Sequence, residues 1–163
     1  MTMPPPGQYG SPHQYGSPQP KVDARRLWSG GLAAAVIAAL VGVVGILIAR
    51  GIFDVEVLAP KRDGAWGDAD TGFYALGAAI ATLLATGLMH LLILFVPRYS
   101  LFFGWIMVLA TAVGVLVPFG LNVDTSAKVA TSLINLALGI TIGSLVSAVA
   151  NSAVRAAAMG NYS

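Results

Sequence analysis

Four long runs of apolar residues constrain this chain more than any other feature of its sequence. They cover residues 27–49, 73–96, 101–119 and 129–154, and none contains an Asp, Glu, Lys or Arg. As a helix, the first run would be about 34 Å long at ~1.5 Å per residue, enough to cross the ~30 Å hydrocarbon core of a bilayer. A helix also satisfies its own backbone amides, which lipid cannot do. We therefore predict an all-α membrane protein, a four-transmembrane-helix bundle.

The composition agrees with lipid as the surrounding solvent. Charged residues make up 10% of the chain, whereas a water-soluble domain usually carries about 25%. The chain has no cysteine, which excludes disulfides and thiolate chemistry. Its basic residues are scattered, so the net charge of +2 predicts no nucleic-acid partner. The first run is longer than the apolar part of a signal peptide, and Arg50 follows it, so we interpret it as a retained span.

The polar segments divide the chain further. Residues 1–24 are rich in Pro, Gly and Tyr and repeat QYGSP, which predicts a disordered cytoplasmic tail. That tail is either a docking segment for a partner or a solvated extension. Residues 25–155 form the predicted transmembrane domain, and residues 156–163 a short cytoplasmic C-terminus.

The connections between the runs are short except for one. The outer loop, residues 50–72, holds a partly alternating stretch, Ile52–Leu58, which predicts an extended segment along the membrane surface. A very short turn joins the second and third runs, which predicts an antiparallel helical hairpin. Pro118 predicts that the backbone loosens or kinks near the end of the third run.

Basic residues near the span ends predict the orientation, because Lys and Arg favour the cytoplasmic side. With both termini inside, five basic residues lie inside and four outside. The pair Arg25–Arg26 directly precedes the first span, and Arg98 lies in the central turn. We therefore expect an N-in, C-in protein of the cell inner (plasma) membrane.

The fourth run carries a row of small and amide residues at every fourth position. We call this row the packing seam; it consists of Asn135, Gly139, Gly143, Ser147 and Asn151. A step of four advances only about 40° around a helix, so the row stays close to one face. Small residues let helices approach closely in lipid. We interpret the row as a helix-packing surface rather than a lipid-facing coincidence.

His90 is the one side chain within the four runs that ionises near neutral pH, and intramembrane polar groups often mark function. It shares a helical stripe with Thr82 and Thr86. Counted along the helices, Ser144 and Ser147 lie at a similar depth, so we expect a neutral imidazole bonded to one of these serines. The alternative is a proton or ion relay, which would normally use a second titratable group.

No sequence pattern of a nucleotide site, a zinc protease or a serine hydrolase occurs. The two histidines, His13 and His90, are too far apart in the chain to indicate a metal site. We therefore expect no catalytic, cofactor-binding or metal-binding residues, and a protein that is not an enzyme.

Several short motifs carry a family resemblance. They are ARG at Ala49–Gly51, VLAP at Val57–Pro60, ATLLATGLMHLLILFVPR at Ala81–Arg98, LVPFG at Leu116–Gly120 and DTSAKVATSLINL at Asp124–Leu136. With these motifs the chain resembles an actinobacterial, mycobacterial-type family of small four-span integral membrane proteins of unknown function. The resemblance covers roughly residues 27–154. It implies an inner membrane and supplies no catalytic residue.

Two functions are compatible with these features. The first is a non-catalytic accessory or scaffolding subunit, whose partners are the lipid bilayer and other membrane proteins or copies of itself. The alternative is a small transporter or channel that uses the polar residues His90 and Asn135. The sequence names no small-molecule substrate and no cofactor.

Overall fold

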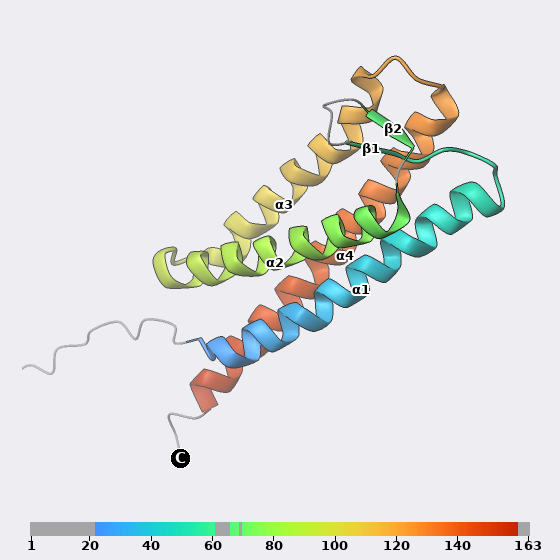
Figure 1. Ribbon diagram of the computed structural model, residues 1–163. Helices are drawn as coiled ribbons and strands as arrows, with labels where there is room; N and C mark the ends of the chain where they lie inside the picture. The colour runs from blue at the N-terminus through green and yellow to red at the C-terminus, as the bar shows by residue number, and fades with distance from the viewer. Residues whose placement is uncertain (1–21, 61–65, 69, 160–163) are drawn as a thin grey trace, which may run out of the picture.

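Four long helices and one small hairpin make up the computed structural model, which describes residues 22–60, 66–68 and 70–159 (Figure 1). The elements in chain order are α1 (Ala24–Gly51), β1 (Leu58–Pro60), β2 (Trp66–Asp68), α2 (Thr71–Phe95), α3 (Tyr99–Leu116), the 3-10 helix η1 (Val117–Gly120) and α4 (Thr125–Met159). The four helices, the third counted together with η1, are long and apolar enough to cross a membrane. The predicted all-α membrane fold is thus confirmed at this level. Most of the predicted tail lies outside the described residues.

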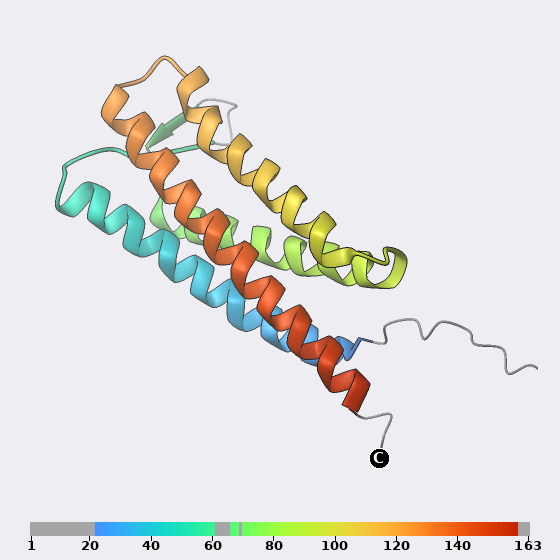
Figure 2. The ribbon, with the colours of Figure 1, turned by 180° about the vertical axis from the view of Figure 1, so that it is seen from behind.

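The helices run alternately up and down between two ends of the molecule. The hairpin end holds β1, β2 and the connection from η1 to α4 (Figure 1). The terminal end holds the start of α1 and the end of α4, where the backbone N–H of Asp23 donates to Ala153 O at 3.4 Å. Both views show α2 and α3 diverging from their shared turn toward the hairpin end (Figures 1 and 2). Both termini of the described chain therefore lie at the same end.

Two aspartates begin helices at points where the first N–H groups have no partner within the helix. Asp23 Oδ1 accepts from the backbone N–H of Arg26 at 3.0 Å, at the start of α1. Asp70 Oδ1 accepts from Gly72 and Phe73 at 2.9 and 3.1 Å, at the start of α2. Such capping satisfies otherwise orphaned donors, and the carboxylate also complements the positive end of the helix dipole.

Pro118 changes the helix geometry as its chemistry predicts. The α-helix α3 ends at Leu116, and the chain continues as η1, with Pro118 in the first turn and buried. Proline lacks an N–H and crowds the preceding turn, so an uninterrupted α-helix is not favoured here. The structure therefore has a change of helix type near Pro118, where the sequence predicts that the backbone loosens or kinks.

The connection from α1 to α2 packs against the bundle through Val57 and Leu58, and its position along the membrane surface stays a prediction. Val57 and Leu58 are 0% and 3% exposed. β1 pairs antiparallel with β2, with Leu58 opposite Asp68. The N–H of Leu58 donates to Thr131 Oγ1 of α4 at 2.9 Å. Burying two apolar side chains and satisfying this N–H together favour docking onto the helix ends.

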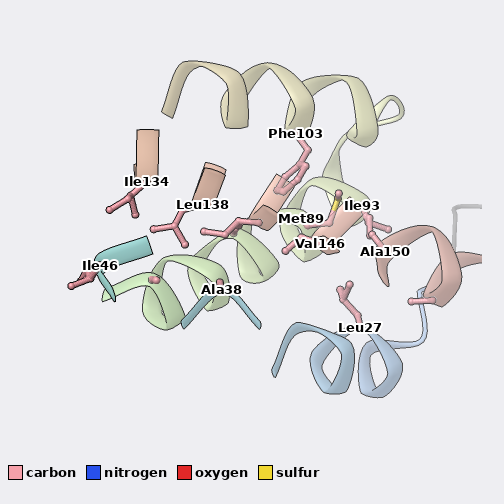
Figure 3. Packing of buried hydrophobic residues seen from close by; sticks show 14 of the residues in the cluster. Leu27, Ala38, Ile46, Met89, Ile93, Phe103, Ile134, Leu138, Val146 and Ala150 are labelled. Carbon is pink, nitrogen blue, oxygen red and sulfur yellow. The ribbon is translucent and has the colours of Figure 1, made fainter. Parts of the chain in front are cut away.

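The core follows the middle of the bundle and is built mainly from α1, α2 and α4. Figure 3 shows its labelled side chains: Leu27, Ala38, Ile46, Met89, Ile93, Phe103, Ile134, Leu138, Val146 and Ala150. From Ile134 to Ala153 the buried residues of α4 recur every three or four positions, which is the helical repeat. Phe103 is the buried residue of α3. The third helix therefore contributes little to the core.

A glycine of α1 lies opposite a threonine of α2 in close contact. A Cβ at Gly31 would lie 2.6 Å from Thr86 Cγ2, so only glycine fits without a shift. Thr82 and Thr86 are fully buried, and each hydroxyl donates to a carbonyl one turn earlier, Ala78 O and Thr82 O. These hydroxyls need no interhelical partner, so their predicted role as functional polar groups finds no support in these contacts.

Replacing Thr131 with Val is expected to destabilise the hairpin end. The substitution keeps the side-chain shape but leaves the buried N–H of Leu58 without its acceptor, at a cost of about 1–3 kcal/mol. Thr141→Val is the matched control, because both threonines donate to a carbonyl one turn earlier: Thr131 to Ala127 O and Thr141 to Ala137 O. Hydrogen exchange at Leu58 and unfolding in detergent measure the effect. Equal effects of the two substitutions would contradict the role of Thr131.

Candidate functional site

The third helix lies on the outside of the bundle. In the most apolar part of each span, 33% of the residues are buried in α1 and in α2, 28% in α4, and only 6% in the span Tyr99–Gly120. This span rests on α4 along one narrow strip, and an apolar depression lies on each side of that strip. The unusual exposure of α3 makes the two depressions the main candidates for a site.

The first depression, which we call the α2–α3 crevice, is lined by residues of α2, α3 and α4. Its volume is 680 Å³. Its lining residues are Phe73, Tyr74, Gly77, Ala78, Ala81, Leu84, Ala85, Leu88, Ile106, Met107, Ala110, Thr111, Gly114, Asn135, Leu138, Gly139 and Ile142. No lining residue is charged, and most are apolar. A Cβ at Gly77 would meet nothing within 4 Å, so this glycine borders open space.

One end of the crevice carries a hydrogen-bonded group that joins three helices. Tyr74 Oη of α2 donates to Asn135 Oδ1 of α4 at 2.6 Å. Asn135 Nδ2 in turn donates to Gly114 O of α3 at 2.7 Å. Sequence reasoning found Asn135 but missed Tyr74, whose position near the start of a span is also typical of an ordinary interfacial aromatic residue. The signal that could have found it is a Tyr and an Asn at comparable depth on two spans.

This group still has unused hydrogen-bonding capacity. A phenol can accept as well as donate, and a carboxamide has two N–H donors and two acceptor lone pairs. After the bonds described above, Tyr74 Oη retains an acceptor position and the Asn135 amide retains one N–H. The group is neutral, so it suits a hydroxyl or an ester carbonyl better than an ion.

The packing seam on α4 faces α3 over part of its length. A Cβ at Gly139 would overlap the side chain of Thr111, and one at Gly143 would lie 3.7 Å from Met107 Cβ. Asn135 reaches Gly114 O. These three positions let α3 approach α4, and the large buried residues of α4 occupy the neighbouring stripe.

The far end of the seam differs. Ser147 lines the second depression, the α3–α4 groove, which lies on the other side of α3 from the crevice and has a volume of 590 Å³. Asn151 is exposed. The α3–α4 contact therefore does not extend along the whole predicted row.

His90 is bonded to a different partner from the one expected. Trp28 Nε1 of α1 donates to His90 Nδ1 at 3.3 Å, and the two rings meet edge to face, with centroids 6.5 Å apart. The predicted bond to a serine of α4 is wrong, because the stripe of α2 that carries His90 faces α1. Ser144 is exposed and donates to Thr141 O of its own helix. His90 and Asn135 thus belong to separate groups.

The acidic and histidine side chains do not gather into a metal site. Among residues 22–60, 66–68 and 70–159, no three His, Cys, Asp or Glu side chains lie close enough together to hold a metal ion. His13 falls outside that part of the chain. The arrangement that remains is an apolar, laterally placed crevice with one polar end.

These features define a multi-pass α-helical membrane protein. The chain belongs to a family of unknown function (DUF6069), whose model matches residues 22–158. The match includes all four helices and the loops between them, which agrees with the resemblance to an uncharacterised family. Comparison with curated proteins and with solved structures gave no match.

Removing either member of the Tyr74–Asn135 pair should destabilise the fold, and the two effects should not add. In a double-mutant cycle of Tyr74→Phe and Asn135→Leu, we expect a coupling energy of about 0.6 kcal/mol and at most ~1.7, the range of measured interhelical hydrogen bonds in membranes. Reversible unfolding in mixed micelles gives the four free energies. Strict additivity would show that the bond contributes nothing to stability.

Gly139→Ala should separate α3 from α4. The new methyl group overlaps the stiff, β-branched Thr111, and overpacking of this kind costs about 1–3 kcal/mol. Gly104→Ala on α3 is the control, because a Cβ there meets nothing within 4 Å. An alanine in an open helical position should be neutral or stabilising by about 0.5–1 kcal/mol. If the two alanines changed the free energy of unfolding alike, Gly139 would not be a close contact.

Proposed function

We propose that this protein is a non-catalytic accessory or scaffolding subunit of a larger membrane assembly, and that α3 is the helix it presents to its partner. The observation that supports the proposal is the exposure of α3, whose span is 6% buried against 28–33% for the others. Because so little of α3 is buried, α3 adds little to the stability of this chain alone. It offers a nearly complete helix surface to another subunit.

One face of α3 suits close contact with a second helix. Gly104, Val108 and Ala112 follow one another at every fourth position and line the α3–α4 groove. We call these three residues the docking face. Association in lipid depends on tight packing and interhelical hydrogen bonds, because apolar burial gains little there. A small residue on either side of Val108 lets a partner backbone come near, and Ser147 on the opposite wall supplies a hydroxyl.

The alternative of a small transporter or channel has no specific observation in its favour. Its two candidate residues lie apart: His90 pairs with Trp28, whereas Asn135 pairs with Tyr74. Intramembrane transport sites usually combine titratable or charged groups around one cavity. The groove contains neither kind of group, and the crevice contains one titratable side chain, the phenol of Tyr74, and no charged one.

The cellular setting is part of the same proposal. The distribution of Lys and Arg supports an N-in, C-in orientation. The resemblance described above supports an actinobacterial inner membrane. In that orientation the repeat-containing N-terminal segment is cytoplasmic, where it provides a second contact for the partner.

Photo-crosslinking in native membranes tests the proposal. A photoreactive amino acid replaces Val108 on α3 or, as the matched control, Val36 on α1; these valines are 60% and 61% exposed. We expect Val108 to yield a discrete adduct with another membrane protein, identified by mass spectrometry, and Val36 to yield mainly lipid adducts.

Two results would contradict the proposal. Lipid adducts alone at both positions would mean that no subunit covers α3. An adduct of Val108 only with a second copy of this chain would replace the accessory subunit with a homo-oligomer.

A further inference from the structure

We propose that the α2–α3 crevice binds a single chain of a long-chain lipid, whose ester or hydroxyl oxygen meets the Tyr74–Asn135 pair at the hairpin end. This inference goes beyond the proposed function, because the crevice and the docking face lie on different sides of α3. The crevice has an apolar lining along much of α2, small residues keep it open, and its polar end can bond an oxygen atom.

The length and the lining of the crevice suit a hydrocarbon chain. From Phe73 to Leu88 the crevice follows α2 for about 22 Å at ~1.5 Å per residue. No lining residue is charged, and most are apolar. A lipid chain lying along such walls gains many small dispersion contacts and leaves no polar group unpaired.

Small residues on both walls create the open space of the crevice. Gly77 and Ala81 on α2 face Ala110 on α3 across the crevice, and Gly77 has nothing within 4 Å of where its Cβ would be. An empty space of this size is unfavourable, because atoms that line a void lose their dispersion contacts. The material available in the bilayer to restore those contacts is a lipid chain.

The polar end of the crevice can form hydrogen bonds with the head of that lipid. Tyr74 lies in the first turn of α2, next to the exposed Asp70 that caps the helix, so the pair is near the level where lipid esters begin. Asn135 has an N–H left to donate, and Tyr74 Oη has an acceptor position left. Together they match an ester carbonyl or a hydroxyl. The lining has no cation for a phosphate, so a neutral oxygen is recognised.

Two other depressions carry a weaker case. The α3–α4 groove has no comparable hydrogen-bonded pair at its end. A third, polar hollow at the hairpin end contains Asp54, Glu56, Asp124 and Lys128, which are surface charges, and no metal cluster forms among the described residues. The crevice combines a long apolar space with a hydrogen-bonded polar pair at one end.

Two substitutions test the proposal, one that fills the crevice and one that fills the α3–α4 groove. Gly77→Phe places a ring in the crevice, and Gly104→Phe places one in the groove at an equally open glycine. Full-length protein, freed of lipid in detergent, is titrated with dioleoylglycerol or with a polyprenol and followed by native mass spectrometry. These two probes separate an ester from a hydroxyl as the recognised group.

We expect saturable 1:1 binding of at least one probe to the unmodified protein and to Gly104→Phe. Gly77→Phe should weaken that binding at least tenfold, and Asn135→Leu should weaken it about three- to tenfold, roughly the value of one hydrogen bond. Ala81→Phe blocks the same space at a second position if Gly77→Phe does not fold. Equal binding by the Gly77 and Gly104 variants, or no saturable binding of either probe, would overturn the proposal.

The two proposals fail separately. Gly104→Phe should abolish the protein adduct formed from Val108 and leave lipid binding intact, and Gly77→Phe should do the reverse. If Gly77→Phe removed the protein adduct and left lipid binding unchanged, the crevice would hold a partner segment, and the lipid site would be wrong.

Discussion

The structure depends on one constraint, the satisfaction of backbone amides in a medium without water. Lipid offers no hydrogen bonds, so each spanning segment must be helical. Irregular backbone is confined to the ends of the helices. There, Asp23 and Asp70 accept from the first N–H groups of α1 and α2, and Thr131 accepts from Leu58 in the hairpin. Lipid thus requires the four helices, and the contacts between side chains determine how the helices pack against one another.

How they meet is decided by small residues rather than by apolar burial. Lipid chains are as apolar as leucine, so helices gain mainly from close approach. Gly31 opposite Thr86 brings α1 against α2, and Gly139 opposite Thr111 brings α3 against α4. Between α2 and α3, small residues face each other without closing the gap. Small residues therefore make close contacts between some helices and leave an open crevice between α2 and α3.

The sequence predicted the features that depend on local chemistry. The four apolar runs and the end of α3 near Pro118 needed only length, hydropathy and the geometry of proline. The partner of His90 could not be predicted in this way. Counting residues gives depth along a helix but not the rotation of one helix about its axis relative to another. Ser144 and Ser147 lie at a suitable depth, but His90 faces Trp28 of α1. The Tyr74–Asn135 pair was missed for the same reason.

The position of α3 links the two proposals physically. A chain in the crevice would contact one side of α3, and a partner helix at the docking face would contact another. α3 is anchored mainly along its strip on α4, where Gly139 meets Thr111 and Asn135 meets Gly114 O. Any shift of α3 that one ligand favours therefore changes the surface offered to the other. Thermodynamic linkage makes such an effect reciprocal, so lipid would alter partner affinity by the same factor by which the partner alters lipid affinity. A weakly buried helix between two binding surfaces is well placed for this coupling, because little packing within the chain opposes its movement.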